Sequence, residues 1–142
     1  MPFDAMSTHS ISSKFVGTKL MFLSRLLDGF TVLLFSASIP GKATIGHGTR
    51  VEHRGIGVVI NKEASIGQRC SIGVHVVIGG KGAGTHGCPI IGDDVIIGAG
   101  AKILGPISVG SGSTIGSNAV VISDVPEGSL AVGVPARILR NG

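Results

Sequence analysis

Aromatic residues are scarce in this chain of 142 residues, which contains five Phe and neither Trp nor Tyr. Charged residues make up only 14% of the chain, whereas glycine occurs 24 times. This composition argues against a conventional globular core of large side chains. The two cysteines, Cys70 and Cys88, are too few for a disulfide framework, and a reducing compartment, the cytoplasm, is expected. The formal net charge of +4 comes without a basic run or an aromatic stacking surface, which argues against a nucleic-acid partner.

The strongest pattern in the chain is an Ile or Val that returns every six residues. The recurring positions are Ile39, Ile45, Val51, Ile60, Ile66, Ile72, Ile78, Ile91, Ile97, Ile103, Val109, Ile115 and Val121. Eight of these thirteen are followed directly by glycine, and a small or apolar residue stands four places after most of them, as at Ala43, Thr49, Ala64, Cys70, Ala101, Ser113 and Ala119. A helical stripe repeats near 3.6 residues, so a period of six favours a solenoid of very short strands.

The repeat predicts which side chains face inward. Residues i and i+4 point to the same side of an extended chain, and glycine at i+1 lets the backbone turn a corner. Three hexads make one coil, which is the spacing from Ile60 to Ile78 and from Ile91 to Val109. The stacked Ile and Val side chains would each contribute roughly 1.5–3 kcal/mol when buried. We therefore expect an all-β parallel solenoid that forms its own core, and periodicity alone does not give its hand.

The N-terminal part lacks the repeat. No secretory signal is evident in its polar first ten residues, and His9 is expected in a flexible tail. Residues 15–35 are strongly apolar, but Lys19, Arg25 and Asp28 interrupt them, so no uncharged stretch there reaches roughly 18 residues. One or two short helices capping the solenoid are expected. The alternative is a peripheral membrane contact through residues 15–35, with the protein cytoplasmic but membrane-associated.

The period breaks twice, and breaks in a rigid solenoid are where functional loops leave it. The first break, residues 51–59, contains Glu52 and His53, and the second, residues 79–90, contains Lys81 and His86. The second is rich in glycine but does not fit the phosphate-loop pattern. We therefore divide the chain into a tail and helical cap (1–37), a solenoid catalytic domain with loop 79–90 (38–126), and a C-terminal segment (127–142).

Three segments carry a resemblance to a known family. They are VEHRGIGVVINKEASIGQRCSIGVHVVIGGKG (51–82), PIIGDDVIIGAGAKILGPISVGSGSTIGSNAVV (89–121) and AVGVPARIL (131–139). Together with the hexads they resemble the hexapeptide acyltransferases, especially serine acetyltransferase and its short relatives in polysaccharide clusters, including the colanic-acid type. The resemblance implies a left-handed parallel β-helix, acetyl-CoA as the acyl donor, direct transfer in a ternary complex, and a homotrimer with its active site between neighbouring subunits.

The resemblance also implies roles for individual residues. His53 matches the family's catalytic histidine, a general base that deprotonates an alcohol as it attacks a thioester. Glu52 matches an acidic residue that helps to hold the acceptor, and His86 lies near an acceptor-side loop histidine. Ser38 stands where serine acetyltransferases have the aspartate that orients the catalytic histidine. Residues expected to line the coenzyme A site, which the C-terminal segment completes, are Gly79, Gly80, Lys81, Ala101, Lys102, Ala119 and Arg137.

Three functional hypotheses follow. The first is O-acetylation of a hydroxyl on a sugar or glycan precursor, favoured by Ser38 and by the absence of the long N-terminal helical domain of serine acetyltransferases. The second is O-acetylation of L-serine. The third is a non-catalytic or metal-binding hexapeptide protein. A zinc site would need histidines at matching heights on adjacent coils, but His47, His53, His75 and His86 do not repeat at coil spacing, so no metal is expected.

Overall fold

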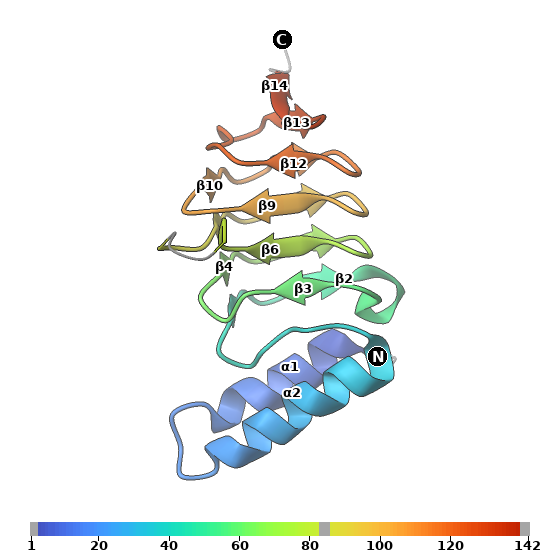
Figure 1. The fold of residues 1–142 in the computed structure, drawn as a ribbon, viewed down its shortest axis with the longest axis vertical. Coiled ribbons are helices and arrows are strands. Elements are labelled where there is room, and N and C mark those ends of the chain that lie inside the picture. The colour runs from blue at the N-terminus through green and yellow to red at the C-terminus, as the bar shows by residue number, and fades with distance from the viewer. Residues whose placement is uncertain (1–2, 83–85, 140–142) are drawn as a thin grey trace.

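The computed structural model describes residues 3–82 and 86–139. Two helices, α1 (Ala5–Ser12) and α2 (Met21–Phe35), joined through the short helix η1 (Ser13–Phe15), lie at one end of a stack of short strands (Figure 1). The strands are β1 (Thr44–Ile45), β2 (Arg50–Val51), β3 (Val59–Ile60), β4 (Ser65–Ile66), β5 (Ser71–Ile72), β6 (Val77–Gly79), β7 (Ile90–Ile91), β8 (Ile96–Ile97), β9 (Lys102–Leu104), β10 (Ser108–Val109), β11 (Thr114–Ile115), β12 (Val120–Val121), β13 (Leu130–Val132) and β14 (Arg137–Leu139).

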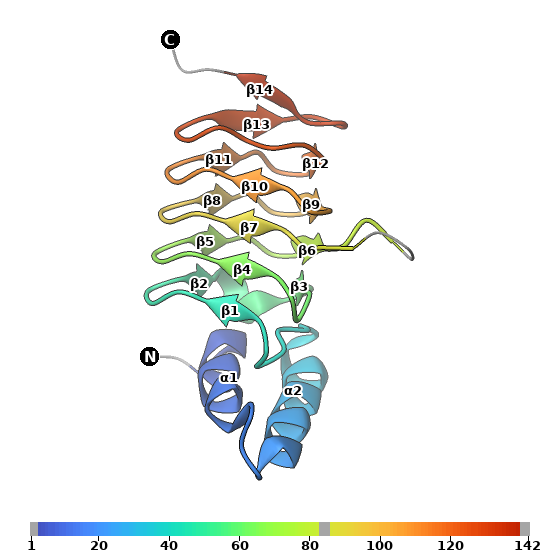
Figure 2. The same cartoon turned by 90° about the vertical axis from the view of Figure 1, so that its left-hand side faces the viewer.

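The strands form the three faces of a solenoid, as the hexads predict. One sheet has the order β1-β4-β7-β10, a second β14-β13-β11-β8-β5-β2, and a third β12-β9-β6-β3. All pairs are parallel except β13 with β14, whose antiparallel hairpin stands at the C-terminal end. Figures 1 and 2 show the strands nearest the viewer running leftward as the chain climbs from helices to C-terminus, the sense of a left-handed coil. We call β12-β9-β6-β3 the front sheet, because it faces the viewer in Figure 1.

The predicted inner column is confirmed. Twelve of the thirteen recurring Ile and Val residues are buried, and Ile45, in the first coil, is half-buried against them. The small residues four places on are buried as well, including Cys70 and Ser113. Because neighbouring strands pair in register, an Ile or Val of one coil stacks on the Ile or Val of the next coil, for example Ile60 on Ile78. Burial raises the pKa of the Cys70 thiol, consistent with a core residue rather than a reactive one.

The helical cap begins earlier than the sequence suggested. Asp4 caps α1 by accepting a hydrogen bond from the Ser7 backbone N–H at 2.8 Å. His9 lies in this helix and is buried, with its Nε2 3.1 Å from the Ala43 carbonyl oxygen of the first coil, and burial lowers its pKa. The expectation that His9 lies in a flexible tail is therefore wrong. The segment AMSTHSIS has no apolar periodicity, and its helix is fixed by packing on the end of the solenoid.

The apolar segment forms α2, and within residues 3–82 and 86–139 no helix has the length and hydrophobicity needed to cross a membrane. The Asp28 carboxylate faces the solenoid junction, where Oδ1 accepts hydrogen bonds from the Ser12 hydroxyl at 2.7 Å and from the Gly41 N–H at 3.1 Å. These bonds tie α2 to α1 and to the turn that enters the first coil.

Candidate active site

The first register break forms a tight turn that presents His53 to solvent. It consists of the short helix η2 (Glu52–Gly55) between β2 and β3. His53 (φ 47°, ψ 43°) and Arg54 (φ 63°, ψ 9°) both have left-handed backbones, and both side chains are exposed. Such conformations cost of order 1–3 kcal/mol each and persist where the surrounding structure enforces them. Left-handed backbones of non-glycine residues also occur singly at other corners, for example at Arg69 and Asn118, whereas two consecutive ones occur, among the described residues, at His53 and Arg54.

Packing from two sides holds the turn. A Cβ on Gly55, whose φ is +87°, would lie 2.9 Å from the Ala5 Cβ of α1 and 3.2 Å from Val51 Cγ2. The His75 ring, from the next coil, lies directly over Gly57, close enough that a Cβ there would overlap it. The turn therefore rests between the helical cap and the coil above. Sequence reasoning treated His75 only as an exposed residue of an ordinary hexad, and did not find its contact with this turn.

The neighbours of His53 are arranged differently from a histidine–carboxylate pair. The Glu52 carboxylate accepts a hydrogen bond from the Ser71 hydroxyl at 3.2 Å, so it points along the sheet of β2 and β5. Ser38 is half-buried and pairs through its backbone with Val59, donating its N–H to the Val58 carbonyl at 2.8 Å. Over the described residues, neither side chain makes a hydrogen bond with the His53 ring. Among the described residues of a single chain, the His53 imidazole therefore has no carboxylate as a hydrogen-bond partner.

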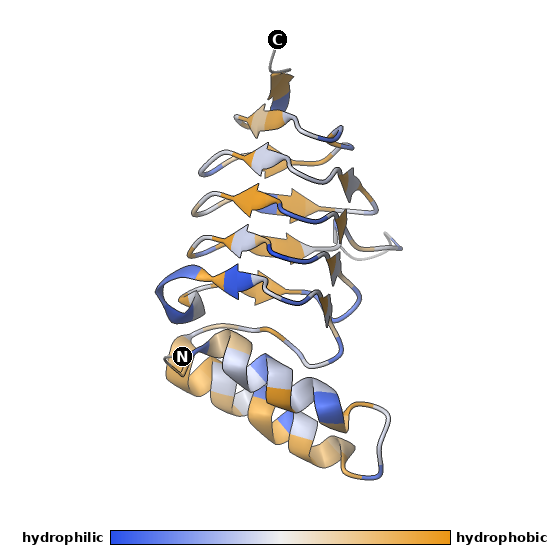
Figure 3. Ribbon diagram, turned by 180° about the vertical axis from the view of Figure 1, so that it is seen from behind, coloured by the Kyte–Doolittle hydropathy of each residue, from blue (hydrophilic) through white to orange (hydrophobic). Residues whose placement is uncertain are grey.

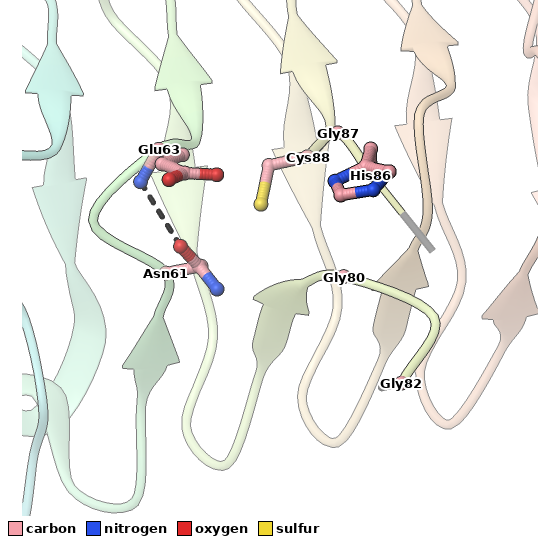
Figure 4. Close-up of a pocket in the computed structure, with 7 residues that line it drawn as sticks. All are labelled: Asn61, Glu63, Gly80, Gly82, His86, Gly87 and Cys88. Carbon is pink, nitrogen blue, oxygen red and sulfur yellow. Dashed lines mark hydrogen bonds between the residues drawn. The ribbon is translucent and has the colours of Figure 1, made fainter. Parts of the chain in front are cut away.

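The second register break borders a depression of about 280 Å³ between β6 and β7. Its lining residues are Asn61, Glu63, Gly80, Gly82, His86, Gly87 and Cys88 (Figure 4). Of the predicted site residues, the structure brings Gly80 and His86 together here. Asn61 and Glu63 were missed, although coil spacing could have found them, because Asn61 stands one 18-residue coil before Gly79. Residues 83–85 of the predicted loop lie outside the described residues.

Two polar side chains of this depression, Asn61 and Glu63, come from the turn beneath the loop. Asn61 Oδ1 accepts a hydrogen bond from the Glu63 N–H at 3.0 Å, which orders the turn. Figure 4 shows the Glu63 carboxylate and Cys88 Sγ facing the same space between turn and loop. Partial burial, and then the charge of Glu63, raise the pKa of the Cys88 thiol. Cys88 is therefore a neutral thiol near pH 7 and a poor nucleophile.

Of the seven predicted donor-binding residues, Gly79 ends β6 and Gly80 follows it in the loop, and the other five fall into two groups. The exposed ones are Lys81, Lys102 and Arg137. Lys81 lies beside Gly105, where an added Cβ would be 3.6 Å from its Cδ. The Lys102 Nζ donates to the Gly100 carbonyl at 2.9 Å, and Arg137 lies on the C-terminal hairpin. The other group, Ala101 and Ala119, is fully buried, and their N–H groups bond within the coil to Gly98 and Gly116. Their carbonyls accept hydrogen bonds from the Val77 and Lys102 N–H groups, so the contact of these two alanines with the donor stays a prediction.

The two register breaks lie at opposite ends of the strands of the front sheet, and we call these two sides its edges. His53 precedes β3 at one edge, whereas the loop that ends at Cys88 follows β6 at the other, and Figure 1 shows them on opposite sides of the molecule. Lys102 stands on β9 in the same sheet. One chain therefore does not bring His53 and His86 together. Across residues 3–82 and 86–139, no three His, Cys, Asp or Glu side chains cluster as a metal site.

Comparison with known proteins agrees with this architecture. Residues 88–123 match the family model "Bacterial transferase hexapeptide (six repeats)". A curated serine acetyltransferase of Synechococcus elongatus is 36% identical over 80 residues, which are 56% of this chain and 32% of that protein. The solved structure of soybean serine acetyltransferase complexed with serine has 38% identity and a TM-score of 0.88, covering 95% of this chain and 56% of that one. Serine acetyltransferase of Brucella abortus strain S19 in complex with coenzyme A has 34% identity and a TM-score of 0.90, covering 95% and 54%.

The repeat and the fold define a hexapeptide-repeat protein. Among proteins of this class, the chain resembles serine acetyltransferase, with both its helices and its coils included in the structural match. It spans about a third of the curated relative and about half of each solved structure.

Proposed function

We propose that the protein is an acetyl-CoA-dependent O-acetyltransferase and that L-serine is its first acceptor to test. The observation that supports this is the match of 95% of the chain, at 34–38% identity, to serine acetyltransferases solved with serine and with coenzyme A. The glycan acceptor expected from the sequence becomes the second candidate, since the comparisons favour serine.

The chemistry assigned to His53 is general-base catalysis. Its imidazole takes the proton of the acceptor hydroxyl while that oxygen attacks the thioester carbonyl carbon. The C–S bond breaks, the acetyl group stays on the acceptor oxygen, and coenzyme A leaves as the thiolate, which takes the proton from the imidazolium and so restores the neutral imidazole. Imidazole suits this exchange near neutral pH. The left-handed turn supports the assignment, because it holds an exposed histidine on a corner braced by α1 and His75.

The donor is assigned to the front sheet and to the loop edge, by which we mean the side of that sheet where β6 ends at Gly79 and the loop follows. Lys81 and Lys102 are exposed cations on or beside this sheet, suited to the phosphates of coenzyme A, and Arg137 lies at the C-terminal end. The pantetheine arm, which carries amides, would pass the glycines of the loop edge at Gly79 and Gly80. Glu52 and His86 are assigned to the acceptor.

A complete site requires two copies of the chain. His53 and the loop edge are separated by the width of the front sheet, so the acceptor and donor sides meet only if the His53 corner of one copy lies against the loop edge of another. A closed ring of three copies would repeat this contact at each interface. We therefore propose a homotrimer with shared sites.

Replacement of Lys102 or Arg137 by Ala is expected to raise the KM for acetyl-CoA while leaving kcat nearly unchanged. Phosphate contacts are equally strong in the ground and transition states, so they contribute uniform binding. The loss should be about 1–3 kcal/mol per contact, because each is charge-assisted. Steady-state kinetics with varied acetyl-CoA measure this. Arg50→Ala removes an exposed cation from β2, outside the proposed site, and serves as the matched control. An unchanged KM in both variants would return Lys102 and Arg137 to the solvated surface.

One observation favours the second candidate, a hydroxyl on a sugar or glycan precursor. Ser38 is a neutral residue where the resemblance implies an aspartate that orients the histidine, and a hydroxyl cannot stabilise an imidazolium by charge. The acceptor is tested by measuring release of coenzyme A thiol with serine, free sugars, nucleotide sugars and oligosaccharides. Release with serine well above the sugars supports the first candidate, and the reverse order supports the second. No release with any hydroxyl acceptor would refute O-acetyl transfer.

A further inference from the structure

Helix α2 is inverted relative to an ordinary amphipathic helix at a protein surface. Its buried face carries two hydroxyls, Ser24 and Thr31, which are 4% and 1% exposed, and one apolar residue at its end, Phe35, which is 8% exposed. The Ser24 and Ser12 hydroxyls are 2.8 Å apart, and the Thr31 hydroxyl donates to that of Thr8 at 2.7 Å. Buried hydroxyl contacts therefore help to join α2 to α1.

The opposite face of α2 is apolar and uncovered by the described residues. Phe22, Leu26, Phe30 and Leu33 are 55–79% exposed, and their spacing of three and four residues places them on one side of the helix. Figure 3 shows hydrophobic residues along the helices at this end of the molecule, away from the coils. We call these four residues the α2 face. A contiguous apolar surface of this kind marks a contact site.

A basic depression adjoins the same helix. Arg25, Lys42 and Lys62 line a space of about 210 Å³ at the junction of α2 with the first coils, together with Met21 and Asp28. Among the described residues, the lining has one carboxylate, Asp28, and its Oδ1 already accepts hydrogen bonds from Ser12 and Gly41. The ion pair that the described residues contain, Arg69 with Asp94, lies elsewhere, so the three cations are available to an anion.

From these two features we propose that α2 is a peripheral membrane-binding helix that selects bilayers with anionic headgroups. The α2 face enters the boundary between headgroups and acyl chains, and the basic depression receives a lipid phosphate. Apolar burial and attraction to anionic lipid together give stable attachment where neither alone does. Several copies in one oligomer would strengthen it through multivalency. This proposal is independent of the acetyl-transfer proposal.

The test is flotation of the purified full chain with lipid vesicles, either pure phosphatidylcholine or with a third of phosphatidylglycerol added. The chain is expected to float with the anionic vesicles and to do so less at high salt. The double variant Leu26→Gln with Leu33→Gln should lower the vesicle partition coefficient roughly tenfold to a hundredfold, because two inserted leucines are lost. Replacement of both Arg25 and Lys42 by Gln should lower binding only to anionic vesicles, roughly fivefold per charge.

Two control variants test whether binding depends on this surface or on any exposed leucine or cation of the chain. Leu139→Gln removes a leucine that is 50% exposed at the far end of the molecule, and Arg50→Gln removes a cation from β2; both should float like the unaltered chain. Failure of the unaltered chain to float with anionic vesicles at low salt would overturn the proposal. The proposal would also be overturned if the leucine double variant floats as well as the unaltered chain but no longer self-associates in light scattering. A second copy of the chain, and not a membrane, would then cover the α2 face.

Discussion

Replacing His53 by Ala is expected to lower kcat by roughly 10²–10⁴, the usual contribution of a general base. Affinity for coenzyme A should stay close to that of the unaltered protein, because His53 is assigned to the acceptor hydroxyl, whereas the phosphate contacts are assigned to Lys81, Lys102 and Arg137. Single-turnover kinetics with acetyl-CoA and the accepted hydroxyl compound measure the chemical step, and calorimetry with coenzyme A measures binding. The two measurements separate catalysis from donor binding.

His47→Ala is the matched control for this variant. His47 is also an exposed histidine at a solenoid corner, between β1 and β2, and no role is assigned to it. It should retain kcat. Full activity of the His53→Ala variant would refute the catalytic assignment. Equal losses in both variants would indicate a general effect of removing surface histidines.

Gly55→Ala is expected to reduce kcat by roughly tenfold to a hundredfold without removing any functional group, because small displacements of a catalytic group are costly. The new Cβ would lie 2.9 Å from Ala5 Cβ at a φ of +87°, so the turn must move away from the helical cap and take His53 with it. The backbone strain should also lower the free energy of unfolding by about 1–3 kcal/mol. Steady-state kinetics and urea unfolding measure these effects.

Gly112→Ala provides the comparison for Gly55→Ala. Gly112 also has a positive φ, +68°, but a Cβ there meets nothing within 4 Å, and it lies at a corner without assigned residues. This variant should lose some stability and keep its kcat. Equal kcat losses in both would mean that stability alone, and not the position of the His53 turn, explains the effect.

The solenoid core was predictable because its period is carried by single side chains. Each buried Ile or Val contributes to the column in the same way, and glycine marks the corner that follows, so the strands and their inward residues follow from the sequence. The hand of the winding does not, because a period of six residues is the same for either hand. The family resemblance supplied it, and the ribbon winds in that sense.

Features that depend on packing between distant segments were not predictable. Helix α1 has no apolar stripe, and His9 is buried because Ala43 offers an acceptor at the end of the solenoid. The left-handed backbone of His53 and its support by Ala5 and His75 involve segments that are far apart in the sequence. The register breaks located both candidate sites, but their separation across the front sheet became visible only in three dimensions.

A site shared between copies is tested most directly by mixing two defective variants. His53→Ala and His86→Ala are co-expressed with different tags, and oligomers that carry both are purified and assayed. If one copy supplies His53 and its neighbour supplies the loop edge, each variant alone has low activity, and the mixed trimers regain about a third of the unaltered activity, since one of the three interfaces in every mixed trimer pairs two intact edges. Mixed oligomers no more active than the average of the two variants, or a fully active His86→Ala variant, would contradict the shared site.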